Sequence, residues 1–130
     1  MTITPVGVCN GWASPHVVVV VAHRAMREFI VELLDCEHGA WAVSAVDSVS
    51  DLDRTASSHP ELVIVDTADF ATCCSELPAT FTLARVVVIG PEPNDAYRQD
   101  ALHRGAGAWL SRDCVAEELC DALRSTLART

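Results

Sequence analysis

The first residue whose type and position suggest chemistry is Asp66, which ends the apolar segment LVIVD (residues 62–66). A carboxylate beside a buried strand costs free energy unless a partner or a ligand compensates its charge. In sheets of parallel strands, functional groups gather where the strands end. Asp66 is therefore predicted to belong to a site, whose kind depends on the elements around it.

Several sites common in small α/β enzymes are absent from the sequence. None of the six cysteines is followed by arginine at the Cys-x5-Arg spacing of a phosphatase, and a P-loop is excluded because there is no lysine. The segment GAGAWL (residues 105–110) lacks the third glycine of a dinucleotide fingerprint and leads into a strand. The segment AHRAMRE (residues 22–28) has no Ser, Thr or Gly for a flavin phosphate. No catalytic residue and no enzymatic function are predicted.

Composition restricts the partners of the chain. Its 130 residues suit one domain, and 50% of them are hydrophobic, which favours a packed core. Nine basic residues, all arginine, stand against 18 acidic ones, and the net charge of −9 argues against nucleic acid and anionic membranes as ligands. The longest apolar run is too short to cross a bilayer, and no secretory signal is recognised. The cysteine spacing gives no zinc motif, so a reduced, cytoplasmic protein is expected.

Five apolar segments alternate with helical patterns along the chain. Strands are predicted at residues 16–21, 40–46, 62–66, 85–90 and 108–111. Helices are predicted at residues 23–34, 47–58, 94–105 and 115–128, and a weaker one after a loop, around residues 73–81. Residues 1–15 are expected to form a flexible tail, and residues 16–130 a single domain. The alternation predicts a doubly wound α/β fold with a five-stranded parallel sheet and five helices.

Three segments together resemble a known family. They are LVIVD, RVVVIG (residues 85–90) and ALHRGAGAWLSRDCVAEELCDAL (residues 101–123). In order and spacing they are similar to the CheY-like receiver domain of bacterial response regulators, above all to receivers of the NarL/LuxR type. The resemblance covers residues 16–128. It implies that Asp66 matches the aspartate that accepts a phosphoryl group, with Mg²⁺ neutralising the phosphoryl oxygens.

Other positions depart from the pattern that the resemblance implies. The acidic pair that holds Mg²⁺ falls on Val21 and Ala22, or on Ala22 and His23 in the alternative register, and the first acidic residue of the chain is Glu28. The hydroxyl expected at the end of the fourth strand is replaced by Gly90. Arg112 stands at the lysine position, and the two cations are not equivalent. Trp109 matches the aromatic residue that moves between buried and exposed rotamers. No metal site is predicted.

Several roles remain open for the polar residues near the site. Asp66 is hypothesised to form a hydrogen-bonded pair with Arg112, and the alternative is a partly solvated carboxylate without function. His23 either joins Asp66 in an unusual metal site or is a solvent-facing loop residue, which is the favoured reading. Cys73 and Cys74 sense redox state, bind a soft metal or fill the third helix, and the last reading is favoured.

The preferred reading is a stand-alone, atypical receiver that acts by protein contact, without a cofactor. The partner is expected to be a histidine kinase, a transcription factor or another receiver, and the last two helices are expected to support a homodimer. One competing hypothesis is a conventional phosphoacceptor that uses Mg²⁺ and is phosphorylated on Asp66. Another is an α/β module that binds a small molecule in the altered pocket.

Overall fold

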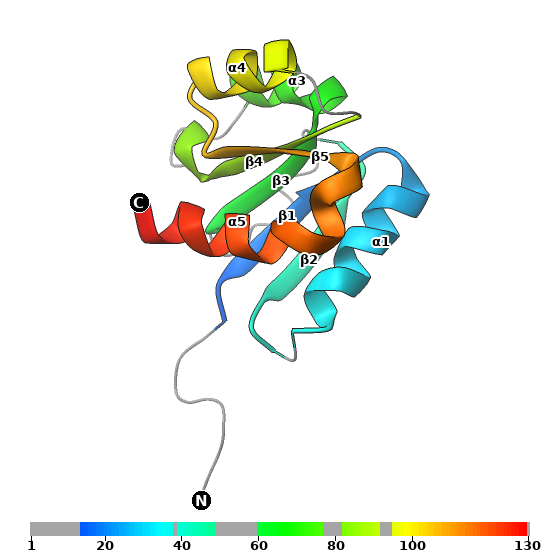
Figure 1. Ribbon diagram of the computed structural model, residues 1–130. Helices are drawn as coiled ribbons and strands as arrows, with labels where there is room; N and C mark the ends of the chain where they lie inside the picture. The colour runs from blue at the N-terminus through cyan, green and yellow to red at the C-terminus, as the bar shows by residue number, and fades with distance from the viewer. Residues whose placement is uncertain (1–13, 38, 49–59, 77–81, 92–94, 130) are drawn as a thin grey trace, which may run out of the picture.

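A five-stranded parallel sheet forms the centre of the computed structural model, which describes residues 14–37, 39–48, 60–76, 82–91 and 95–129 (Figure 1). The strands are β1 (His16–Val20), β2 (Ala42–Val46), β3 (Leu62–Asp66), β4 (Val86–Gly90) and β5 (Ala108–Ser111). They lie in the order β2-β1-β3-β4-β5, and all neighbouring pairs are parallel. The predicted doubly wound α/β fold is confirmed.

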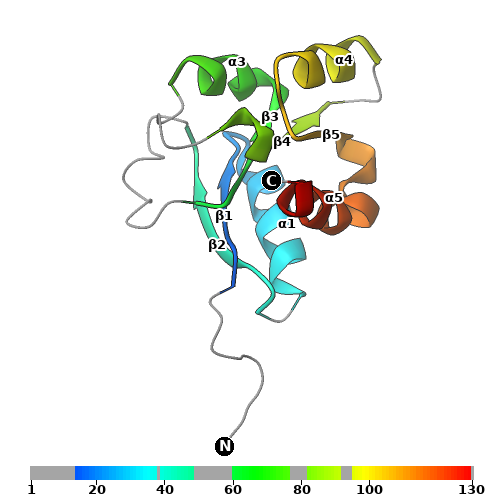
Figure 2. The same ribbon diagram turned by 90° about the vertical axis from the view of Figure 1, so that its left-hand side faces the viewer.

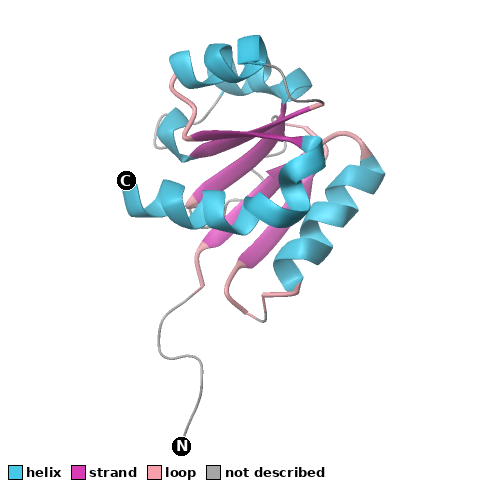
Figure 3. Cartoon of the chain, viewed as in Figure 1, coloured by secondary structure: helices cyan, strands magenta, loops and turns pink. Residues whose placement is uncertain are grey.

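Four α-helices cover the sheet within the described residues. They are α1 (Arg24–Asp35), α3 (Thr67–Glu76), α4 (Asp95–His103) and α5 (Val115–Arg129). Helices α1 and α5 lie on one face of the sheet, and α3 and α4 on the other (Figures 1 and 2). The cartoon coloured by secondary structure shows the same layers (Figure 3). The expected helix at residues 47–58 and the expected tail at residues 1–15 lie almost wholly outside the described residues.

The strands form because their sequences suit burial on both faces. Strands β1, β3 and β4 consist mainly of valine and isoleucine, which are fully enclosed or nearly so. Such β-branched side chains pack well in a parallel sheet that is covered on both sides. Alternate residues of these strands contribute to two hydrophobic clusters, one beneath α1 and α5 and the other beneath α3 and α4.

Helix α3 begins earlier than the sequence suggested. A loop was expected after Asp66 and a helix around residues 73–81, whereas the helix starts at Thr67, directly after β3. The prediction was wrong because it gave no weight to Asp66 as a capping residue: Oδ1 of Asp66 accepts a hydrogen bond from the main-chain N–H of Asp69 at 2.9 Å. Helix α3 therefore starts at the residue most expected to do chemistry.

The glycines of GAGAWL serve the turn between α4 and β5. Gly105 has a φ of 110°, which favours glycine after the end of a helix. The N–H of Gly107 donates to the carbonyl of Val86 at 2.8 Å. A methyl carbon added to Gly107 would lie 2.1 Å from the carbonyl oxygen of Ala84. These glycines are explained by backbone geometry, in agreement with the rejection of a dinucleotide fingerprint.

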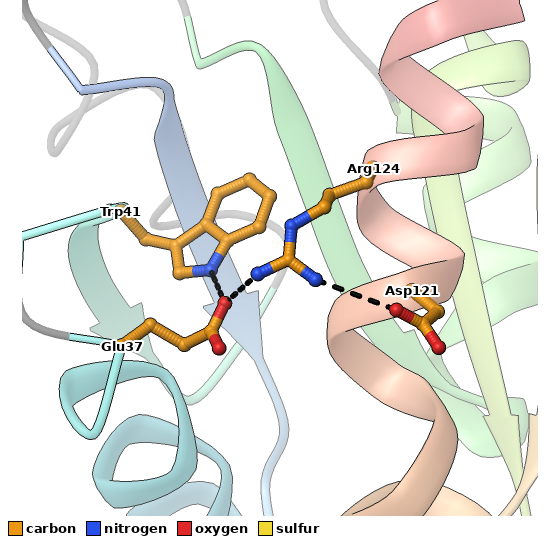
Figure 4. A network of polar contacts seen from close by, with 4 residues as sticks. All are labelled: Glu37, Trp41, Asp121 and Arg124. Atoms are coloured by element: carbon orange, nitrogen blue, oxygen red, sulfur yellow. Dashed lines mark hydrogen bonds and ion pairs between the residues drawn. The ribbon is translucent and has the colours of Figure 1, made fainter.

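A polar network joins the connection between α1 and β2 to α5 (Figure 4). Arg124 forms an ion pair with Glu37 and a second one, at 3.4 Å, with Asp121. The indole N–H of Trp41 donates to Glu37 at 3.3 Å, and the guanidinium carbon of Arg124 lies 5.9 Å from the centre of the Trp41 ring. One arginine thus connects α5 to the segment between α1 and β2 through charge, hydrogen bonding and a cation–π contact.

In the part of the chain that is described, no helix has the length and apolar character needed to span a bilayer.

Candidate functional site

Asp66 lies at the carboxyl end of β3, where the strand order reverses around β1. Its Cα is paired with that of Ile89 on β4, and its side chain is partly buried. A cavity of about 300 Å³ opens beside it. The residues lining the cavity come from the ends of β3, β4 and β5 and from α3 and α4: Asp66, Thr67, Ala68, Ile89, Pro91, Tyr97 and Arg112. The cavity lies where ligands bind in sheets of this type.

Arg112 reaches the same cavity from the other side. It follows β5 as the first residue of a 3-10 helix, Arg112–Cys114, and its side chain is exposed. Among the described residues no ion pair within 4 Å joins Arg112 to Asp66, so the hypothesised hydrogen-bonded pair is not formed. The side chain of Asp66 instead contacts the first turn of α3, through Oδ1.

The end of β1 carries no acidic side chain. Val21 is 1% exposed and belongs to the core beneath α1 and α5, while Ala22 is exposed and has only a methyl group to offer. One Nη atom of Arg27 donates to the carbonyl oxygens of Val21 and Ala22, at 2.7 and 3.3 Å. A fixed positive charge therefore lies against the strand end at which the resemblance places two carboxylates.

Asp69 is the site residue that the sequence analysis missed. It lies on the first turn of α3, and its Oδ2 atom is buried without a hydrogen-bond partner among the described residues. Burial, followed by the charge and hydrogen bonding of Asp66, raises the pKa of Asp69 to about 6, although the main-chain N–H of Ala22 favours the ionised form. The signal was the Asp-x-x-Asp spacing, which places both carboxyl groups on one helical turn once Asp66 is taken as the cap.

The raised pKa predicts a pH-dependent contribution of Asp69 to stability. The folded pKa of about 6 exceeds the ordinary value of 3.8, so this contribution is complete below about pH 4 and is lost as the pH rises through 6. Asp69→Asn imitates the protonated form. It is expected to leave stability unchanged near pH 4 and to raise it at pH 7.5 by about 1 kcal/mol or less, because water screens a partly exposed group.

Urea unfolding of both proteins between pH 4 and pH 7.5 measures this difference. Asp35→Asn is the matched control, since it removes an exposed carboxylate far from the site. The difference in unfolding free energy between Asp35→Asn and the unmodified protein should stay constant as the pH passes through 6. A stability difference for Asp69→Asn that stays constant across the same pH range would contradict the coupling between Asp66 and Asp69.

The other residues that the sequence analysis named serve as helix caps or packing residues where the structure describes their side chains. His23 is exposed and caps α1, because its Nδ1 atom accepts from the N–H of Met26 at 3.3 Å. Cys74 is unpaired and partly buried against the cluster beneath α3 and α4, whereas the side chain of Cys73 lies outside the described residues. Gly90 is buried at the end of β4, and Trp109 lies beside it on β5.

The chain is similar in sequence and in structure to known proteins. No family model matches the sequence. Response regulator MprA from two strains of Mycobacterium bovis is 29% identical over 121 residues, which represent 90% of this chain and 52% of the relative. The chain thus spans about half the length of the curated relatives it matches.

Solved structures reproduce the whole architecture. Full-length FixJ from B. japonicum superposes with a TM-score of 0.75 at 19% identity, covering 91% of this chain and 60% of FixJ. A response regulator receiver domain from Clostridium thermocellum gives 0.69 at 15% identity, covering 88% and 95%. The NarL receiver domain from Mycobacterium tuberculosis gives 0.59 at 24% identity, covering 85% and 97%.

The order of the five strands, the placement of the helices and the similarity to solved receivers define a CheY-like α/β fold. The sequence is also similar to a response regulator over 90% of its length. The CheY-like fold that the resemblance of the three sequence segments implied is confirmed.

The donor set does not fit the Mg²⁺ ion that the fold family implies. Mg²⁺ requires several oxygen ligands in near-octahedral geometry. Asp66 already accepts a helix N–H through Oδ1, and the pKa of Asp69, raised to about 6, shows that a second negative charge beside Asp66 is disfavoured. The described residues contain no cluster of three or more His, Cys, Asp or Glu side chains suited to a metal. In the described part of the site, the end of β1 adds no carboxylate to Asp66 and Asp69, although the ion would need several oxygens.

Proposed function

We propose that this chain is an atypical receiver domain that acts through contact with a protein partner, with little or no Mg²⁺-dependent phosphorylation of Asp66. The observation that carries the proposal is the composition of the β1 end. Val21 is enclosed in the core, Ala22 has no ligand atom in its side chain, and Arg27 holds both of their carbonyl oxygens.

Electrostatics explain why this composition opposes phosphoryl transfer. An acyl phosphate on Asp66 would add about two negative charges beside Asp69. At an effective dielectric constant near 20, each like-charge contact at about 4 Å costs roughly 4 kcal/mol, which the exposed Arg112 offsets only in part. Gly90 further supplies no hydroxyl to hold a phosphoryl oxygen.

The surface formed by α4, β5 and α5 supports the protein-contact role. Tyr97 and Leu102 on α4 are 45% and 37% exposed. Next to them a cavity of about 490 Å³ is lined by Arg98, Leu102, Trp109 and Arg129 among others. The proposed partner is a histidine kinase, a transcription factor or another receiver, including a second copy of this chain. We place the protein in the cytoplasm and assign it no enzymatic activity.

Amide NMR spectra recorded with Mg²⁺ and beryllofluoride, a phosphoryl mimic, test this proposal. The expected result is no saturable shift around Asp66 and Trp109, and no phosphorylated product after incubation with acetyl phosphate. Asp66→Asn serves as the control, because it retains an oxygen that can cap α3 but cannot form the acyl phosphate. Saturable shifts that disappear in Asp66→Asn would support the conventional phosphoacceptor instead.

A further inference from the structure

Gly90 and Trp109 are diagonal neighbours across two strands. The register pairs Val88 with Trp109 and Gly90 with Ser111. Residues two apart on a strand point to the same face, so position 90 and the Trp109 side chain share the face beneath α3 and α4. A methyl carbon added to Gly90 would lie 2.2 Å from Cζ2 and 2.8 Å from Cε2 of Trp109. Carbon atoms pack at about 3.5–4.0 Å, so the indole already occupies this volume.

Packing holds the indole in this inward position. Trp109 contacts the hydrophobic cluster beneath α3 and α4, which includes Val88, Ala101 and Ala106. Its Nε1 atom is buried and has no acceptor among the described residues. A buried indole N–H ordinarily finds a partner, and leaving it unpaired costs free energy. Hydrophobic packing therefore holds the indole in the inward position, although its unpaired N–H costs free energy.

The surroundings of Trp109 also form part of the proposed contact surface. The side chain lines the 490 Å³ cavity between α4 and the start of β5, and it lines a second cavity of about 260 Å³ toward Ser111 and Cys114. If the Trp109 indole turned outward, the shape of both cavities would change. The position of one ring thus sets the form of the surface made by α4, β5 and α5.

We propose that Gly90 and Trp109 are a matched steric pair that keeps the indole inward whatever happens at Asp66. Position 90 has no hydroxyl that could be drawn toward the site, and it has no side chain that could push the ring outward. The surface of α4, β5 and α5 consequently keeps one shape. This inference rests on the proposed function, which it deepens by making that surface independent of phosphorylation.

A double-mutant cycle between Gly90→Ala and Trp109→Leu tests the pair. Gly90→Ala alone is expected to lower the melting temperature by about 5–15 °C, because the added methyl collides with the ring. In the Trp109→Leu background, where the colliding ring atoms are gone, the same substitution should lower it by less than about 3 °C. Trp109→Leu alone is the reference for this second comparison. Equal losses in the two backgrounds would overturn the proposal.

Two further results keep the test decisive. If Gly90→Ala does not fold, a folded double variant supports the pair, and a double variant that is no better than Gly90→Ala overturns it. The indole N–H signal of Trp109, assigned by its loss in Trp109→Leu, should move in Gly90→Ala and exchange faster with solvent; an unmoved signal opposes the pair. The cycle needs neither Mg²⁺ nor a phosphoryl mimic, so it can fail while the proposed function stands, or succeed while that function fails.

Discussion

Gly107→Ala is expected to destabilise the protein by about 3 kcal/mol, because the added methyl has no room. It would lie 2.1 Å from the carbonyl oxygen of Ala84 and 2.8 Å from Cγ2 of Thr126. The first contact is with backbone in the 3-10 helix Leu83–Arg85, which cannot rotate away as a side chain would. The segment is also held by the hydrogen bond from Gly107 to Val86 and by the one from Arg129 to the Gly107 carbonyl.

Urea unfolding followed by circular dichroism measures this loss, and Gly39→Ala is the matched control. Gly39 has a φ of 83°, and a methyl carbon added there meets nothing within 4 Å. Its substitution should cost only backbone strain, about 1 kcal/mol. Similar losses for the two variants would show that the approach of β5 to the 3-10 helix is looser than described.

The second large effect is expected for Ala22→Asp, which should become more stable when Mg²⁺ is added. Ala22 is exposed, so the larger side chain is accommodated, and the new carboxylate joins Asp66 and Asp69 at the strand ends. Without Mg²⁺, the crowding of three acidic groups should destabilise the variant by about 1–2 kcal/mol. With 10 mM Mg²⁺ and a dissociation constant near 1 mM, binding should return about 1.4 kcal/mol.

Thermal unfolding with and without Mg²⁺ detects this response. Ala22→Asn is the control, since it has the same size without the charge and should show no Mg²⁺ dependence. The unmodified chain should likewise remain unchanged. If Mg²⁺ stabilised it as much as it stabilised Ala22→Asp, the end of β1 would not be the reason for weak metal binding.

The fold was predictable because its strongest signals are local and repeated. Five short apolar segments separated by helical patterns leave few arrangements other than a covered parallel sheet. The boundaries at the site were less predictable, because they depend on hydrogen bonds that a pattern does not reveal. Asp66 was recognised as the end of a strand, but its capping of α3 went unnoticed, and Asp69 was missed for the same reason.

The tertiary contacts of the site could not be predicted from the sequence. The substitutions at Val21, Ala22, Gly90 and Arg112 were evident from their positions along the chain. The approach of Arg27 to the β1 carbonyls and the filling of the Gly90 volume by Trp109 depend on side-chain paths between elements. Asp66 and Arg112 line the same cavity, but no ion pair within 4 Å joins them in the described residues, and the strand ends alone could not fix this distance.

The cap that Asp66 provides links covalent chemistry to the persistence of a helix. An ester on Oδ1 would make that atom a poor acceptor for the Asp69 N–H, and losing the cap would cost about 1 kcal/mol unless the carboxyl group turned to present its other oxygen. Amidation, as in Asp66→Asn, keeps a carbonyl oxygen that can cap α3, so the two modifications should affect the helix end differently. The atom best placed to react is also the one that starts α3.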